Sequence, residues 1–69
     1  MEKRKYNRIK AVLADKDVDQ KALSAYLGTG ETSVSRWCNN KAQPSIDVFF
    51  KIAEFLHVSV CDLLVEEKK

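Results

Sequence analysis

The sequence predicts an all-α fold, a compact bundle of five short helices with tight connections. Apolar residues recur three and four positions apart along the whole chain, which is the spacing of helices buried on one face. The every-second-residue alternation of strands is nearly absent. Gly28, Gly30, Asn40 and Pro44 separate the apolar segments, and each is a residue type that commonly marks a helix boundary.

The first two helices are expected over residues 6–15 and between Asp19 and Gly28. Asp19 is a favourable N-cap, and Gly28 can adopt the left-handed conformation that ends many helices. Val18 would fill the turn between them. The residues expected on the inner face of these two helices are Ile9, Val12, Leu13, Ala22, Leu23, Tyr26 and Leu27, with Tyr26 as a partly buried packing residue.

A third helix is expected over residues 31–39, with Gly30 as its N-cap and Asn40 as a left-handed residue at its end. Pro44 rules out a helix through the loop "KAQP" that follows. The side chains expected to be buried on this helix are Val34, Trp37 and Cys38.

Two further helices are indicated by their capping residues. Ser45 is expected to cap a fourth helix over residues 46–56, and Ser59 to open a short fifth helix with Asp62 as its capping-box partner. His57 would end the fourth helix, where the helix dipole favours it. The expected core side chains here are Ile46, Phe49, Ile52, Ala53, Leu56, Leu63 and Leu64.

Length and charge limit the class of protein. The 69 residues leave room for one domain, expected over residues 1–69 with a basic arm at 1–5 and a frayed tail at 65–69. The net charge of +2 does not by itself indicate nucleic acid, although five of the first ten residues are basic and one is acidic. No signal peptide or membrane-spanning run is present, so a cytoplasmic location is expected.

Catalytic and metal-binding chemistry find no support in the sequence. The spacing of Cys38, His57 and Cys61 matches no zinc pattern, and both cysteines are expected to be reduced, small apolar residues. Paired carboxylates at a useful spacing are missing, and the "GTG" turn lacks the lysine of a phosphate-binding loop. We therefore expect no enzyme, no cofactor and no metal site.

Residues 19–40, "DQKALSAYLGTGETSVSRWCNN", have the layout of a helix-turn-helix motif, in which a tight glycine-containing turn joins two short helices. In that motif the second helix lies in the major groove of DNA, and its N-terminal residues contact base edges. Leu23, Leu27, Val34 and Trp37 would pack the two helices together and leave a polar face of the second helix outside.

The chain resembles the Cro/repressor-type helix-turn-helix family, often called the XRE family, over residues 7–64. The resemblance rests on segments in the family's order: "RIK", Gln20, "LSAYLG", "SVSRW", "QPS", "KIAEFL" and "VSVCDLL". It implies a lambda-repressor-like five-helix fold and a sequence-specific transcriptional regulator that binds double-stranded DNA, usually as a homodimer. Such a protein would be nucleoid-associated when bound, with no membrane or small-molecule partner expected.

The resemblance also implies roles for individual residues. Gln20 corresponds to the glutamine that bonds a phosphate and braces the recognition helix. The base-edge candidates are Glu31, Thr32, Ser33 and Arg36. The phosphate candidates are Gln20, Ser35, Asn39 and Lys41. The chemistry agrees, since arginine can bond guanine N7 and O6 with two prongs, whereas amide and ammonium groups suit phosphate oxygens.

Several residues leave alternatives open. Glu31 stands where the family usually has glutamine, arginine or lysine, so it could accept from cytosine N4 or simply complement the helix dipole. Arg36 could contact a phosphate or be solvated instead of reading a base. The basic arm "KRKYNR" could follow the DNA backbone, reach a minor groove or be a solvated tail. Asn40 replaces a common glycine, and Cys38 a common glutamate.

An apolar stripe on the fourth helix suggests a partner. Val48, Ile52 and Phe55 lie at i, i+4 and i+7, and family members commonly have smaller or polar residues at the first and last of these. We hypothesise a symmetric homodimer through the fourth and fifth helices, with Val60 or Leu64 at the edge of the contact. The alternative function is an antitoxin-like or accessory module that uses the same fold mainly to hold a protein.

Overall fold

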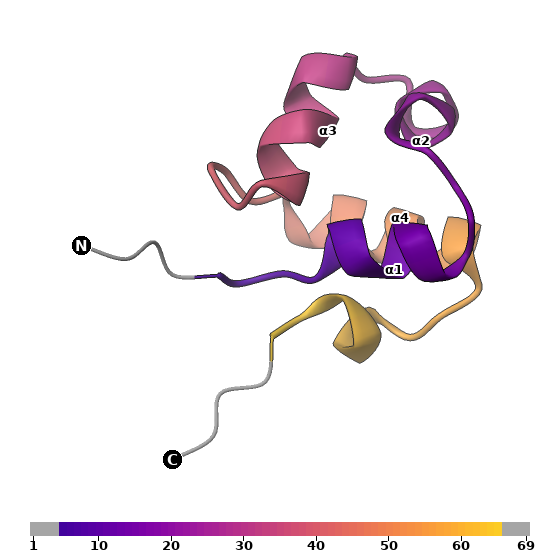
Figure 1. Ribbon diagram of the computed structural model, residues 1–69, viewed down its shortest axis with the longest axis vertical. Coiled ribbons are helices and arrows are strands. Elements are labelled where there is room, and N and C mark those ends of the chain that lie inside the picture. The colour runs from indigo at the N-terminus through magenta and orange to yellow at the C-terminus, as the bar shows by residue number, and fades with distance from the viewer. Residues whose placement is uncertain (1–4, 66–69) are drawn as a thin grey trace.

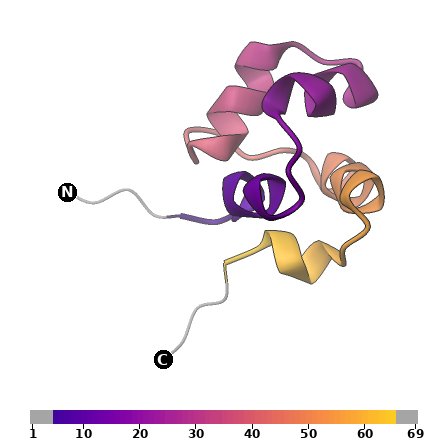
Figure 2. The same cartoon turned by 45° about the vertical axis from the view of Figure 1, so that its right-hand side comes forward.

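The computed structural model describes residues 5–65, which form four α-helices and one short 3₁₀ helix (Figure 1). The elements in chain order are α1 (Ile9–Asp15), α2 (Gln20–Leu27), α3 (Glu31–Cys38), α4 (Ile46–Leu56) and η1 (Val60–Leu63). Figure 2 shows α2 and α3 together on one side of α1 and α4, with η1 on the opposite side. The all-α prediction is confirmed. The prediction of five α-helices is wrong, because η1 is a 3₁₀ helix of only four residues.

Capping residues set the helix boundaries as expected. The Asp19 carboxylate accepts a 2.8 Å hydrogen bond from the Ala22 N–H, and the Ser45 hydroxyl accepts one of 3.3 Å from the Val48 N–H. Ser59 and Asp62 form the predicted capping box of η1. These bonds satisfy backbone donors that a helix N-terminus otherwise leaves without partners.

The start of α1 is where the prediction of a helix over residues 6–15 fails. Residues 6–8 are not helical; they pair with the last described residues through an isolated antiparallel bridge between Asn7 and Leu64. The Arg8 N–H donates to the Leu63 carbonyl at 2.7 Å, and the Val65 N–H donates to the Tyr6 carbonyl at 3.0 Å. Val65, expected in a frayed tail, is therefore held in place, while residues 1–4 and 66–69 lie outside the described part.

The core lies where the helices meet. Its buried apolar members are Ile9, Val12, Leu13, Leu23, Val34, Cys38, Phe49, Ile52, Ala53, Leu56 and Leu63. Val18, Leu27 and Trp37 are half-buried and pack against this cluster, as expected.

Three residues expected in the core are exposed instead. Ile46 is 70% exposed, and Ala22 and Leu64 also lie at the surface. Tyr26, expected to be a partly buried packing residue, is 49% exposed and packs on Phe55. Periodicity assigns these residues to the inner face of a helix, but it does not tell how far the neighbouring elements reach along that face. Ile46 is the first residue of α4 and Leu64 follows the last residue of η1, so both lie at the edges of the packed region.

The apolar stripe of α4 is covered within the chain more than its spacing suggests. Ile52 is fully buried in the core, so its assignment to a dimer surface is wrong. Phe55 is half-buried and stacks on Tyr26 of α2, with ring centroids 4.5 Å apart. The most exposed aromatic on α4 is Phe50, at 57%, one helical turn after Ile46. No helix of residues 5–65 is long and apolar enough to cross a membrane.

Candidate nucleic-acid interface

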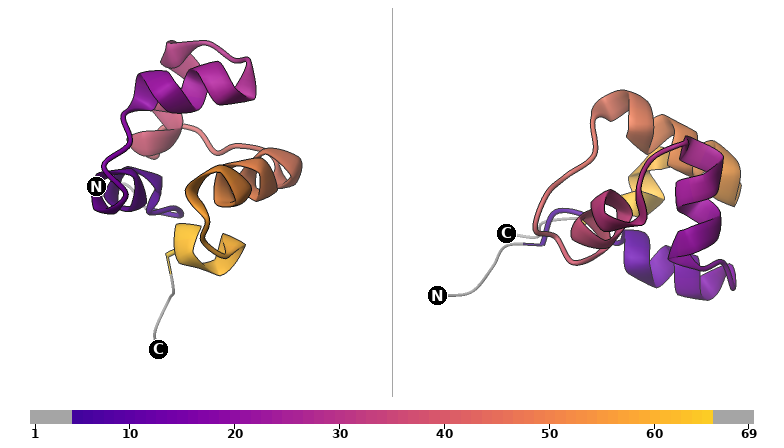
Figure 3. Two further views of the ribbon diagram at one scale, coloured as in Figure 1. Left: turned by 90° about the vertical axis from the view of Figure 1, so that its right-hand side faces the viewer. Right: turned by 90° about the horizontal axis from the view of Figure 1, so that it is seen from above.

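A helix, a tight turn and a second helix form the upper part of the molecule in the left view of Figure 3. Gly28 ends α2 in the left-handed conformation, with φ of 69°, and its N–H donates to the Ala25 carbonyl. Gly30 precedes α3 with extended backbone as its N-cap. Leu23 and Val34, one from each helix, are fully buried. This packing fixes α3 against α2 and leaves its polar side at the surface.

The polar side of α3 borders an open concave surface of about 510 Å³, which we call the α3 hollow. Its lining consists of Gln20, Glu31, Thr32, Ser35, Arg36, Asn39 and Lys41. Seven of the eight residues nominated from the sequence for nucleic-acid contact thus line one surface. Gln20 comes from the first position of α2, which the fold brings beside α3.

Ser33 is the nominated residue that does not line the α3 hollow. It is half-buried, as is Trp37 four residues later on the same side of α3. Ser33 therefore lies on the side of α3 that faces the bundle rather than on the side that faces the hollow.

Hydrogen bonds hold the C-terminal end of α3 and the loop behind it. The Asn39 amide donates to the Ser35 carbonyl at 3.0 Å and to the Ser35 hydroxyl at 3.4 Å. The Lys41 N–H donates to the Arg36 carbonyl at 2.9 Å. The polar groups at this end of the hollow are therefore positioned before any ligand arrives.

The charges of the α3 hollow come from three residues. Arg36 and Lys41 are cationic and exposed, and Glu31 is an exposed carboxylate in the first turn of α3. A carboxylate there complements the positive end of the helix dipole. The hollow keeps one net positive charge and offers hydroxyl, amide and guanidinium groups, which are the groups that bond phosphates and base edges.

Behind α3 lies a cluster of three amide side chains that sequence reasoning missed. The Asn40 carbonyl oxygen Oδ1 accepts hydrogen bonds from the backbone N–H groups of Tyr6 and Asn7 and from the Gln43 amide. The Asn7 amide donates to Gln43 Oε1 at 2.7 Å and to the Trp37 carbonyl at 3.0 Å. We call Asn7, Asn40 and Gln43 the amide cluster. The only signal in the sequence was an asparagine where the family commonly has glycine.

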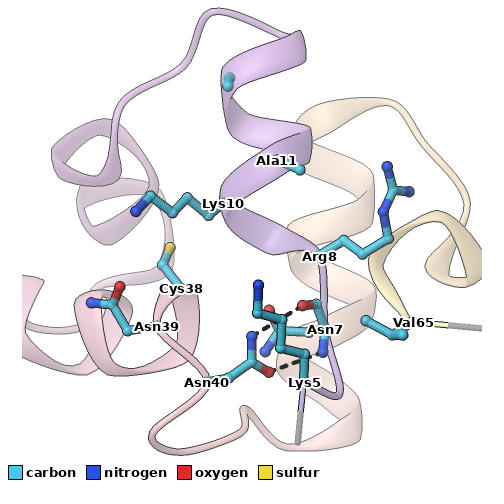
Figure 4. A pocket seen from close by; sticks show the side chains of 10 residues that line it. Lys5, Asn7, Arg8, Lys10, Ala11, Cys38, Asn39, Asn40 and Val65 are labelled. Atoms are coloured by element: carbon cyan, nitrogen blue, oxygen red, sulfur yellow. Dashed lines mark hydrogen bonds between the residues drawn. The ribbon is translucent and has the colours of Figure 1, made fainter. Parts of the chain in front are cut away.

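The amide cluster borders a second concavity, of about 460 Å³, between α1 and the end of α3 (Figure 4). We call it the α1 hollow. Cys38 lies in its wall, and burial raises the pKa of this thiol above its ordinary value of 9.0, with the positive charge of Lys10 opposing the shift. Within residues 5–65, no three His, Cys, Asp or Glu side chains gather closely enough to hold a metal ion.

Comparisons with known proteins agree with this arrangement. A helix-turn-helix family model matches residues 9–63, from the first residue of α1 to the last of η1. The chain is also similar to a candidate DNA-binding protein from Bacteroides fragilis, known from a crystal structure, with 46% identity and a TM-score of 0.85. That match covers 86% of this chain and 95% of the other. A comparison with curated proteins gives no match. The chain belongs to the XRE-type helix-turn-helix family.

Proposed function

We propose that this protein is a sequence-specific DNA-binding transcriptional regulator that inserts α3 into the major groove of double-stranded DNA. The observation that carries the proposal is the composition of the α3 hollow, which gathers polar residues from α2, α3 and the following loop on one surface. Family membership and the similarity to a candidate DNA-binding protein support the same function. A helix-turn-helix presents its second helix to the groove in this way.

The residues of the hollow divide into two roles. Arg36 and Thr32 are the proposed base readers, because both are exposed on α3 and can bond base edges directly. Gln20, Asn39 and Lys41 are the proposed phosphate contacts, which set the register of the protein on the duplex without reading sequence. Ser35, bonded to Asn39, supports that contact. Glu31 either accepts from a cytosine or serves the helix dipole, and Ser33 is proposed to contribute little.

We further infer that the protein acts as a homodimer on a short inverted repeat, since two α3 helices would then enter the groove about 34 Å apart. A domain of this size buries little surface alone, so a partner subunit would add stability. The proposed contact surface lies on α4, η1 and the residue that follows η1, and it uses the apolar side chains that remain at least partly exposed there. These are Ile46, Val48, Phe50, Phe55, Val60 and Leu64.

Selection from a pool of randomised duplex DNA tests this proposal. We expect enrichment of a two-fold symmetric site, with affinity that falls between about 50 and 200 mM salt as phosphate contacts lose their counterion-release advantage. Binding without enrichment would mean that the protein associates with phosphates only, and the proposal of sequence reading would be wrong. Absence of binding at both salt concentrations would favour the accessory protein-binding module.

A further inference from the structure

The α1 hollow is more strongly basic than the α3 hollow. Lys5, Arg8 and Lys10 are among the residues that line it, and none of its lining residues is a carboxylate. A concave surface with cations and no compensating anion attracts negatively charged ligands. Neither the base-edge nor the phosphate candidates taken from the family include these three residues.

The side chains of the three cations are not equivalent. Figure 4 shows Lys10 extending from α1 toward Cys38 and Asn39, whereas Arg8 extends to the other side. The Arg8 guanidinium donates to the backbone carbonyl of Asp62 at 3.2 Å. Lys5 and Lys10 are therefore the cations that remain available to a ligand in the hollow.

Lys5 directly precedes the segment that the amide cluster holds. The backbone N–H groups of Tyr6 and Asn7 are bonded to Asn40 at 2.9 and 3.1 Å, so the attachment point of the Lys5 side chain is fixed relative to the end of α3. A ligand in the hollow would therefore have to order the Lys5 side chain but not the backbone that follows it.

The α1 hollow is continuous with the proposed DNA-binding surface. Asn39 lines both the α1 hollow and the α3 hollow. A third hollow, of about 260 Å³, is lined by both Lys10 and Gln20. Lys10 also lines the α1 hollow, and Gln20 also lines the α3 hollow. Lys10 thus faces the side of the molecule on which the proposed phosphate contacts of Gln20 and Asn39 lie.

We propose that the α1 hollow is an additional phosphate site, in which Lys5, Lys10 and Asn39 bind a backbone phosphate of DNA that flanks the bases read by α3. This inference rests on the proposed function. The DNA backbone is the favoured source of the phosphate, because a duplex bound at the α3 hollow would present its flanking phosphates at high local concentration. A free phosphate ion has no such advantage at an open surface bearing two flexible lysines.

The test compares the salt dependence of DNA binding for charge-matched variants. Lys5→Gln/Lys10→Gln removes both cations of the hollow, and Lys21→Gln/Lys51→Gln removes two exposed lysines that line none of the three hollows. On the selected duplex, we expect the first variant to reduce the slope of log K against log salt by about 0.9 for the lost phosphate. The control variant should keep the wild-type slope, and both should keep the wild-type base preference and melting temperature.

A shortened duplex adds a second measurement. Trimming base pairs outside the selected site should weaken wild-type binding and leave the Lys5→Gln/Lys10→Gln variant unaffected. Equal slopes for both double variants on the full duplex would overturn the phosphate site while leaving the proposed function intact. A changed base preference in the hollow variant would also overturn it, because the lysines would then act on sequence reading. If the wild-type protein bound no DNA, both proposals would fall together.

Discussion

Asn40 and Asn7 are joined by two reciprocal hydrogen bonds across 33 residues of sequence. Oδ1 of Asn40 accepts from the Asn7 N–H at 3.1 Å, and Nδ2 of Asn40 donates to the Asn7 carbonyl at 3.2 Å. The Asn40 side chain thus pairs with the backbone of Asn7 much as a neighbouring strand would. Since Asn7 is also bridged to Leu64, this one side chain connects the end of α3 to both ends of the described chain.

The amide cluster should contribute measurably to stability. Asn40 has φ of 57°, so Asn40→Gly keeps the backbone conformation while removing the side-chain hydrogen bonds. We expect it to lower the free energy of unfolding by about 1–3 kcal/mol, given a net value of about 1 kcal/mol for each bond. Asn40→Ala should cost about 1 kcal/mol more because alanine is strained at positive φ. Urea denaturation measures both, and a wild-type midpoint for Asn40→Gly would contradict the role of the cluster.

Arg36 and Lys41 should differ in what they contribute to DNA binding. Arg36→Ala should cost about 1–3 kcal/mol and relax the preference at one position of the half-site, because a bidentate contact to guanine is lost. Lys41→Ala should weaken binding about equally for all sequences and reduce the salt slope by about one. Titration of the selected duplex and of single-base variants separates the two. If Arg36→Ala weakened all sequences equally, Arg36 would be a phosphate contact.

Phe50 offers a cleaner test of the dimer than Phe55. Phe50 projects into solvent, so Phe50→Asp should leave the fold intact and, if α4 forms the dimer surface, shift the protein to a monomer. Phe55→Asp should also destabilise the chain, because it breaks the stack on Tyr26. Sedimentation at micromolar concentration, combined with thermal unfolding of both variants, gives the answer. A dimer that persists in both would exclude this face of α4.

The two cysteines should differ in reactivity. Cys61 is exposed, whereas Cys38 is buried with a raised thiol pKa, so at about pH 8 it has less reactive thiolate than an ordinary cysteine. Iodoacetamide should therefore label Cys61 quickly and Cys38 only on unfolding, with Cys61→Ser as the variant that reports Cys38 alone. Rapid labelling of Cys38 in folded Cys61→Ser would show that the α1 hollow opens.

The raised pKa of the Cys38 thiol also makes the stability of the folded protein depend on pH. Because the folded-state pKa of Cys38 is raised, its contribution to stability is present below its ordinary pKa of 9.0 and is lost as the pH rises through the folded-state value. Cys38→Ala should reduce the part of the alkaline destabilisation that comes from this thiol, as followed by urea denaturation at increasing pH.

The sequence by itself determined the local features of this protein. Asp19, Gly28, Gly30 and Ser45 mark helix ends through bonds and backbone angles within a few residues, so short-range chemistry is enough to locate α2, α3 and α4. The polar face of α3 follows from the same reasoning, since helical spacing alone brings its residues onto one side.

The tertiary structure decided what depends on contacts between distant residues. It holds Asn7 in an extended segment against Leu64, where local pattern predicted a helix. It buries Ile52 completely and leaves Ile46 exposed, although both have the spacing of core residues. It also brings Lys10 beside Cys38 and Asn39 (Figure 4). These outcomes depend on which surfaces the packed helices cover, and that is set by the whole bundle rather than by any one segment.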